Sequence, residues 1–296
     1  MCYGGENNMK VVIMTDSCCD LAISFVRENK IEVMPLIVNI KGEDIPDDLG
    51  ETLENKEFYN ALRGGDLTST ACANTFEYIK SFKKHVEKGE AVIYIGFSSG
   101  LSGCINSASI ARETVLEEYK DADITVIDSK SASLGLGLIV HYGCNLLNRG
   151  YTKEKIVEWI EENKLKVNHW FTVDDLNHLK RGGRVSQTAA TVGTVLHIKP
   201  IMNVNNDGKL IPISKVKGRK KSIRTLAEIV KERIIESEKQ VIFISHGDCI
   251  EEAEHLKNLL LEENKVKDII INPVGPVIGS HSGPGTLAVF FIGEER

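Results

Sequence analysis

The sequence predicts a protein of the α/β class, with two domains of mainly parallel sheet flanked by helices and an antiparallel hairpin in the second domain. Two observations lead to this prediction. Short apolar runs alternate with amphipathic segments along the chain, as strands and their covering helices do in parallel sheets. In the second half, strand-like runs at 200–204 and 209–216 flank Asn205-Asn206-Asp207-Gly208, and an Asp-Gly turn favours a hairpin.

The apolar runs predict strands, in chain order, at 10–14, 33–40, 91–95, 124–127, 170–173, 240–245 and 269–272. The segments between them predict helices near 20–30, 55–63, 75–88, 104–119, 133–149, 153–165, 220–237 and 250–264. The pattern changes after two long helices. We therefore expect a polar tail over 1–8, an N-terminal domain over 9–166 and a C-terminal domain over 167–296.

Composition and charge argue against two classes of protein. Of the 296 residues, 42% are hydrophobic and 26% are charged, which is typical of a soluble globular protein. The net charge of -6 and the lack of aromatic residues within the basic stretches argue against nucleic-acid binding. The uncharged stretch 131–148 is interrupted by His141 and Asn145, so we expect no integral membrane segment.

Cysteine and histidine spacing limits the chemistry further. The seven cysteines form no Cys-x-x-Cys pair and residues 1–8 do not resemble a secretory signal, so we expect reduced thiols and a cytoplasmic location. The histidines show no metal-binding spacing, and neither a dinucleotide fingerprint nor a P-loop occurs. We therefore expect no metal and no cofactor.

The segment 94–103 is the most informative stretch of the chain. An apolar run ends in a loop of Gly and Ser, and a predicted helix follows. Free N–H groups and small hydroxyls at a helix N-terminus favour a bound carboxylate or phosphate. The string Gly96-Phe97-Ser98-Ser99-Gly100 also fits the nucleophile elbow of a serine hydrolase, with Asp128 or Asp248 and His281 following in the expected order. No His-Gly-Gly-Gly-type oxyanion segment precedes this elbow, so a hydrolase is the alternative.

Other loops that follow predicted strands are rich in short polar side chains. Examples are Thr15-Asp16-Ser17, 128–131, 246–248 and the stretch 68–70 before a predicted helix. A single loop of this kind predicts only a helix N-cap. Several of them in one chain favour a ligand site outside the carboxyl ends of the strands.

Taken together, these motifs resemble the DegV family, the fatty-acid-binding proteins of bacteria. The resemblance extends from Met9 through the rest of the chain. Its marks are Thr15-Asp16-Ser17, Thr68-Ser69, 98–103, Asp128-Ser129-Lys130, 179–184, Lys199-Pro200-Ile201, and Gly275-Pro276-Val277 leading to His281.

The resemblance implies two α/β domains with a fatty acid between them, its acyl chain in a tunnel in the N-terminal domain and its carboxylate at the mouth. It also implies an ATP-dependent fatty acid kinase as partner, which phosphorylates the bound acid to an acyl phosphate. A lipid-binding protein of this kind is not itself an enzyme. Position by position, the residues implied to hold the head group are Thr68, Ser69, Ser98, Ser99, Arg184 and His281.

This chain departs from the family pattern near the head group. Where the family often has Thr-Ser-Gln-Pro, the sequence is Thr68-Ser69-Thr70-Ala71, and Cys104 stands where Thr is usual. For the acyl chain, the uncharged stretch 131–148 contains three glycines, which indicate close approach of another group, either a ligand or a packed sheet. The expected lining residues are Phe97, Ile110, Leu134, Leu138 and Phe291.

A basic run opens the predicted helix near 220. It comprises Lys215, Lys217, Arg219, Lys220, Lys221 and Arg224. Positive charge at a helix N-terminus opposes the helix dipole, so local helix stability does not explain it. The run is either a docking surface for an acidic partner or phosphates near the kinase site, or a solvated face.

Overall fold

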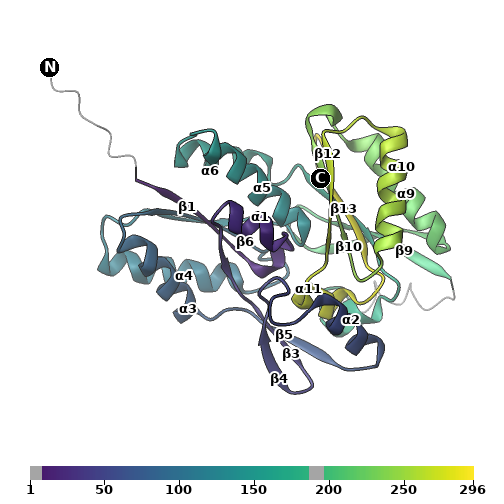
Figure 1. The fold of residues 1–296 in the computed structure, drawn as a ribbon, viewed down its shortest axis with the longest axis horizontal. Helices are drawn as coiled ribbons and strands as arrows, with labels where there is room; N and C mark the ends of the chain where they lie inside the picture. The colour runs from purple at the N-terminus through teal and green to yellow at the C-terminus, as the bar shows by residue number, and fades with distance from the viewer. Residues whose placement is uncertain (1–8, 187–196) are drawn as a thin grey trace.

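The computed structural model describes residues 9–186 and 197–296, in which the strands form three sheets covered by helices (Figure 1). The α/β class is confirmed. The predicted polar tail over 1–8 lies outside the described residues. Each predicted helix is present, with ends that differ by a few residues.

The first sheet is parallel and has the strand order β2-β1-β6-β7. Its strands are β1 (Val11–Asp16), β2 (Glu32–Met34), β6 (Ala91–Gly96) and β7 (Ile124–Asp128). Successive side chains point to opposite faces of a strand. Met14 accordingly packs with α3 (Thr75–Val86) and α4 (Cys104–Glu118), and Ile13 packs with α5 (Leu134–Asn148).

A small antiparallel sheet with the order β4-β3-β5 adjoins the first one. Its strands are β3 (Ile37–Ile40), β4 (Glu43–Pro46) and β5 (Thr68–Ala71). The sequence predicts one strand over 33–40, but β2 ends at Met34 and β3 begins at Ile37. Pro35 lies between them and has no N–H to donate. The helix α2 (Asn55–Arg63) connects β4 to β5.

The second sheet is mixed and has the order β10-β9-β8-β13-β11-β12. Its strands are β8 (Val167–Thr172), β9 (Ile198–Val204), β10 (Leu210–Lys217), β11 (Val241–His246), β12 (Asp268–Pro273) and β13 (Leu287–Ile292). Among the described strands of this second sheet, only β11 and β12 pair in parallel. The expected mainly parallel arrangement therefore holds for the first sheet alone. The predicted hairpin is confirmed as β9–β10.

The two faces of the second sheet have different coverings. The helices α9 (Arg219–Arg233) and α10 (Ile250–Glu263) cover one face, where Phe291 is buried. The other face carries Phe171, Phe243 and Phe290, which share a core with α5 of the first half (Figure 1). The strands of the first sheet and of the small sheet end by Asp128, and those of the second sheet begin at Val167. The two halves defined in this way pack on one common core.

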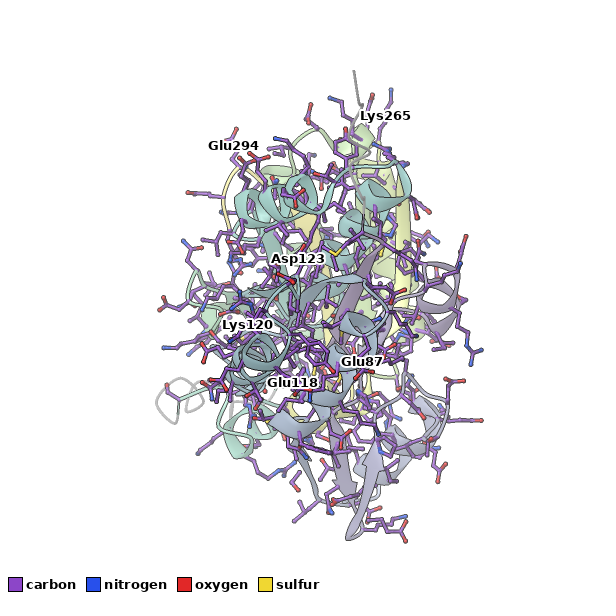
Figure 2. All side chains as sticks on the ribbon, turned by 90° about the vertical axis from the view of Figure 1, so that its left-hand side faces the viewer. Glu87, Glu118, Lys120, Asp123, Lys265 and Glu294 are labelled. Carbon is purple, nitrogen blue, oxygen red and sulfur yellow. The ribbon has the colours of Figure 1, made fainter. Side chains whose placement is uncertain are left out.

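The remaining helices are shorter: α1 (Ile23–Glu28), α6 (Lys153–Asn163), α7 (Asn177–Arg181), α11 (Pro276–Ser282) and the 3-10 turns Ser17–Cys19 and Ser237–Lys239. No helix in residues 9–186 and 197–296 has the length and apolarity to span a bilayer. Over α3 and α4 the charged side chains point to solvent, among them Glu87, Glu118 and Lys120 (Figure 2).

Two buried carboxylates of the first half hold the start of α11, which belongs to the second half. Asp20 Oδ1 accepts from the Gly275 N–H at 3.0 Å, and Asp47 Oδ2 accepts from the Val277 N–H at 3.3 Å. Burial raises the pKa of Asp47 to about 7 and that of Asp20 well above its ordinary value. Carboxylates near the first turn of a helix satisfy its free N–H groups, so α11 is fixed to the other half of the molecule.

The raised pKa of Asp47 predicts a specific pH dependence of stability. An unfolded aspartate has a pKa of about 3.9, whereas folded Asp47 keeps its proton up to about pH 7. Folding therefore takes up a proton between these values, and this stabilisation, complete below the unfolded pKa, is lost as the pH rises through the folded one. Asp47→Asn keeps an acceptor oxygen, and its free energy of unfolding should fall less steeply over this range, by up to about 1.4 kcal/mol per pH unit.

Urea unfolding at a series of pH values measures this difference. The matched control is Asp121→Asn, because Asp121 is exposed and should leave the slope of the wild-type protein unchanged. Parallel slopes for Asp47→Asn and the wild-type protein would show that Asp47 does not titrate in this range.

Candidate functional site

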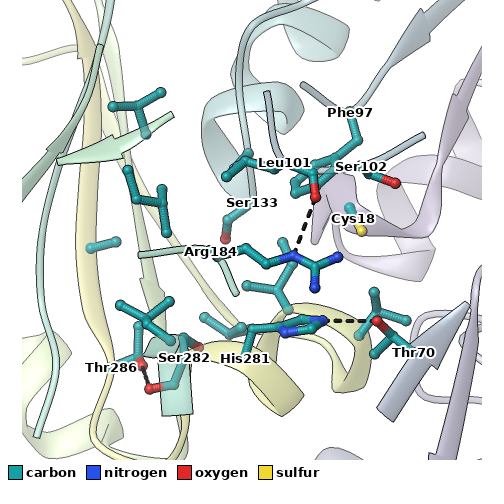
Figure 3. Close-up of a pocket in the computed structure, with 18 of the residues that line it drawn as sticks. Cys18, Thr70, Phe97, Leu101, Ser102, Ser133, Arg184, His281, Ser282 and Thr286 are labelled. Carbon is teal, nitrogen blue, oxygen red and sulfur yellow. Dashed lines mark hydrogen bonds between the residues drawn. The ribbon is translucent and has the colours of Figure 1, made fainter. Parts of the chain in front are cut away.

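A cavity of about 320 Å³ lies between the two halves of the molecule (Figure 3). This volume is within the range of small-molecule sites. Its walls are mostly apolar and come from both halves: Cys18, Leu36, Ala71, Phe97, Leu101 and Ala132 from the first, and Phe171, Leu179, Val204, Leu210, Val274, Val277, Ile278, Ala288 and Phe290 from the second. The sequence places a tunnel inside the N-terminal domain, whereas the structure places the cavity between the halves.

A polar group lies at one side of this apolar cavity. His281, on α11, is 2.8 Å from Thr70 of β5, measured from Nε2 to Oγ1 (Figure 3). The two residues are 211 positions apart in the sequence. Their contact depends on β5 in the first half and on α11, whose first turn is held by Asp20 and Asp47. The head of the cavity is therefore assembled by the contact between the two halves.

Arg184 also lines the cavity, beside His281 (Figure 3). Its Nε donates to the carbonyl oxygen of Leu101 at 3.2 Å, and Nη1 donates to that of Gly182. Burial, with the positive charge of Arg184, lowers the pKa of His281 to about 4. The imidazole is therefore neutral at pH 7, and the positive charge at this side of the cavity is that of the guanidinium.

Ser102 adds a hydroxyl just before α4. Its Oγ is 3.0 Å from the Cys104 Sγ, at the N-terminus of that helix. Among residues 9–186 and 197–296, two buried polar atoms at the cavity have no hydrogen-bond partner: Ser282 Oγ and His281 Nδ1. Ala71, Cys72 and Gly103 are exposed lining residues, which places the opening beside this polar group. Unpaired buried groups of this kind require an explanation, and a bound head group supplies one for Ser282.

The predicted head-group residues divide into two sets. Arg184 and His281 line the cavity, whereas Thr68, Ser69, Ser98 and Ser99 do not. On β5 the residue that meets His281 is Thr70, two positions beyond Thr68. A strand repeats every two residues, so both threonines fit the same alternation, and only the register against α11 selects Thr70.

A similar correction applies to the serine loop. The residue of this loop that reaches the cavity is Ser102, four positions after Ser98. Ser98 is fully buried, its Oγ donates to the Gly208 carbonyl at 2.8 Å, and it accepts from the Gly100 N–H at 3.1 Å. Ser99 is exposed, and its Oγ accepts from Lys130 Nζ at 2.8 Å. The loop contains three serines, Ser98, Ser99 and Ser102, and of these Ser102 lines the cavity.

These contacts do not form the triad of the hydrolase alternative. The Ser98 hydroxyl donates to a backbone carbonyl, not to a histidine, and His281 pairs with Thr70. The two candidate acids are occupied elsewhere: Asp128 forms an ion pair with Lys130 at 2.7 Å, and Asp248 forms one with Arg63. A serine hydrolase needs the nucleophile hydrogen-bonded to its base, so this arrangement is not favoured.

Of the five residues expected to line an acyl chain, Phe97 is the one that lines the cavity. Ile110 is 46% exposed on the outer side of α4. Leu134 and Leu138 are buried in the shared core without reaching the cavity, and Phe291 packs under α9 and α10. On β13 the alternation of side chains sends Phe290 to the cavity and Phe291 to the opposite face.

The glycines of the uncharged helix have a different explanation from a ligand. A Cβ at Gly135 would lie 2.1 Å from His169 Nε2, and one at Gly137 would lie 2.6 Å from the Cys19 carbonyl oxygen. Protein atoms thus make the close approach that the sequence indicated. The cavity as a whole suits an amphiphile with a long apolar part and one small polar head.

Comparisons with known proteins agree with this fold over the full length of the chain. The family model described as "Uncharacterised protein, DegV family" matches residues 10–294. A DegV domain-containing protein of Clostridium perfringens is 47% identical over 287 residues, which is 97% of this chain and 99% of that protein. A solved structure of a DegV lipid binding protein from Thermotoga maritima has a TM-score of 0.84 at 31% identity, covering 97% of this chain and 100% of that one.

A second solved structure is described as DegV, a fatty acid binding protein from Bacillus subtilis. It has a TM-score of 0.83 at 28% identity and covers 97% of this chain and 100% of that one. A family match over almost the whole length, together with a close relative of the same length, establishes membership. The chain belongs to the DegV family.

Proposed function

We propose that this protein binds a long-chain fatty acid in the cavity and presents its carboxylate to an ATP-dependent kinase, which phosphorylates it to an acyl phosphate. The acyl chain lies along the apolar walls. The carboxylate lies among Thr70, Ser102, Arg184 and His281. The observation that carries the proposal is the apolar cavity with this polar group beside its opening. Relatives described as lipid binding or fatty acid binding support the choice of ligand.

The affinity comes mainly from the acyl chain. Burying a methylene contributes about 0.8 kcal/mol, so a chain of about sixteen carbons supplies roughly 11 kcal/mol before ordering costs. The polar group then fixes which end of the ligand faces the opening. Neutral donors suit this role. Ser102 provides one hydrogen bond, and the Thr70–His281 pair provides one more, because a hydroxyl bonded to a neutral imidazole leaves one donor free; neither forms a tight bidentate ion pair.

The same head group favours transfer of the acid to a kinase. Two N–H groups of Arg184 already donate to backbone carbonyls, so the guanidinium does not offer its full edge to a carboxylate. A carboxylate held by single hydrogen bonds keeps lone pairs for attack on phosphorus. Ser98, the nucleophile of the hydrolase alternative, lies outside the cavity walls. We therefore propose a carrier of substrate and not an enzyme.

A cluster of exposed cations gives the kinase a surface to dock on. We name it the basic cluster. It consists of Lys215, Lys217, Lys220, Lys221 and Arg224. Within the part of the chain that the structure describes, none of these five side chains forms an ion pair or hydrogen bond. Arg219, beside them, pairs with Glu252 at 2.6 Å. Unpaired charge of one sign favours an acidic partner surface.

The proposed location is the cytoplasm. In the described residues Cys18, Cys19, Cys72, Cys104, Cys144 and Cys249 are free thiols. Free thiols, one of which (Cys72) is exposed, suit a reducing compartment. A kinase that uses ATP would be found in the same compartment.

Substitution of Thr70 tests the head-group site. Thr70→Val keeps the shape of the side chain and removes its hydroxyl, so palmitic acid should bind about 10- to 100-fold more weakly, as expected for a lost hydrogen bond to a charged group. Isothermal titration calorimetry with palmitic acid measures the Kd. The matched control is Thr68→Val, two positions earlier on β5 and outside the cavity, which should leave the Kd unchanged.

Native mass spectrometry of the protein purified from cells tests the ligand class directly. A co-purified mass equal to that of a long-chain fatty acid is expected, and His281→Ala should lose most of it because the imidazole lines the head of the cavity. A different class of bound molecule, or none together with no binding of added palmitic acid, would refute the proposal.

Charge reversal in the basic cluster tests the kinase partner separately. Lys220→Glu combined with Lys221→Glu should leave palmitic acid binding unchanged and slow acyl phosphate formation at least about tenfold, because close charge pairs at interfaces contribute more than about 1.4 kcal/mol. Hydroxylamine trapping of the acyl phosphate, with ATP and a bacterial fatty acid kinase, measures the rate. Equal rates for Lys220→Glu/Lys221→Glu and the wild-type protein would place the docking surface elsewhere.

A further inference from the structure

The hairpin β9–β10 forms one wall of the cavity. Val204, at the end of β9, and Leu210, at the start of β10, both line it. β10 is the outermost strand of its sheet, and in the residues that the structure describes the pairing of β9 with β8 is limited to Trp170↔Asn203 and Phe171↔Met202. The hairpin is paired along its own length and is joined to the rest of the sheet over a short stretch.

The turn of this hairpin is attached to the other half of the molecule at the Ser98 loop. Ser98 Oγ donates to the Gly208 carbonyl at 2.8 Å, inside a fully buried contact. A Cβ at Gly208 would lie 2.0 Å from that same Oγ, and one at Gly100 would lie 2.6 Å from the Asp207 carbonyl oxygen. The two loops thus meet backbone to backbone, with the serine hydroxyl as the side-chain hydrogen bond between them.

Arg296 holds the other end of the same turn. Its Nη1 donates to the Asn205 carbonyl at 3.1 Å and to the Lys130 carbonyl at 2.7 Å. Lys130 belongs to the first half, and its Cα would lie 3.2 Å from a Cβ at Gly208. Both ends of the turn are therefore fastened by hydrogen bonds to backbone carbonyls, in addition to the apolar packing of Val204 and Leu210 beside it.

We propose that Ser98 is the latch of a movable cavity wall: its hydrogen bond to Gly208 closes the hairpin β9–β10 over the bound acyl chain. Release of this bond lets the turn lift and carries Val204 and Leu210 away from the tail. The wall then opens for exchange of the ligand. The inference rests on the proposed fatty acid binding, and it assigns to Ser98 a role in closure in place of a contact with the carboxylate.

A latch and a head-group contact have different kinetic consequences. The proposed latch joins two parts of the protein and does not line the cavity, so its loss lowers the barrier to entry and to exit alike. Association and dissociation rate constants then rise together and the Kd changes little. Loss of a head-group contact weakens only the bound state, so the dissociation rate constant and the Kd rise in proportion.

The experiment compares Ser98→Ala with the matched control Ser109→Ala by stopped-flow fluorescence with cis-parinaric acid. Ser109 also donates to a carbonyl, that of Ile105 at 2.8 Å, but within α4 and outside the cavity walls. Ser98→Ala should raise both rate constants about fivefold, the effect of one hydrogen bond, with the Kd constant within about twofold. Ser109→Ala should change neither rate.

Gly208→Ala perturbs the same turn from the other side, because its Cβ would lie 2.0 Å from Ser98 Oγ and because the positive φ of Gly208 disfavours a side chain. It should likewise raise both rate constants, and peptide hydrogen exchange over 203–210 should increase in Gly208→Ala and Ser98→Ala. A rise of the dissociation rate constant alone, or unchanged rates and exchange, would overturn the latch. Absence of binding in the wild-type protein would refute the fatty acid proposal, while hydrogen exchange in the free protein would still decide whether Ser98 holds the turn.

Discussion

The two halves of the molecule meet through buried hydrogen bonds at the start of α11, and the cavity forms around this contact. Buried Asp20 and Asp47 of the first half bind the first turn of α11, and α11 carries His281 to Thr70 of β5. Burial opposes the ionisation of both carboxyl groups and raises the pKa of each. The N–H groups at the helix start offset part of this cost, because they donate hydrogen bonds to the buried carboxyl oxygens. The head of the cavity exists only while this contact is in place.

The sequence predicted the positions of helices better than it predicted strand pairing and the residues of the site. Periodicity located α2, α4 and α10 almost to the residue, since an amphipathic helix carries its own signal. It did not give the strand directions of the second sheet, because β13 inserts between β8 and β11 through long-range pairing. The same limit applies to faces: Phe290 and Phe291 are equally apolar, and only the pairing of β13 decides which one meets the cavity.

The cavity is lined by residues from several of the loops that the sequence singled out. Among the predicted site residues, Arg184, His281 and Phe97 line it, and their contact with a ligand stays a prediction. Thr70 and Ser102 also line the cavity. Thr68, two positions before Thr70, and Ser98, four positions before Ser102, do not. Local sequence held equivalent hydroxyls at both positions, and the choice between them was made by α11 and by the hairpin, which lie more than a hundred residues away. A single sequence carries no signal for such a choice.

The position of Ser98 outside the cavity walls also bears on how an apolar ligand dissociates. An acyl chain that gains roughly 11 kcal/mol by burial cannot be exchanged quickly through a narrow opening beside the head group. A wall that moves as one piece avoids drawing each methylene past that opening in turn. The hairpin β9–β10 fits this requirement, because polar bonds at Gly208 and Asn205 fasten its turn and apolar side chains at Val204 and Leu210 face the ligand. Hydrogen bonds between backbone and hydroxyl are weak in net terms, about 1 kcal/mol each, so such a fastening holds the closed state without making it permanent.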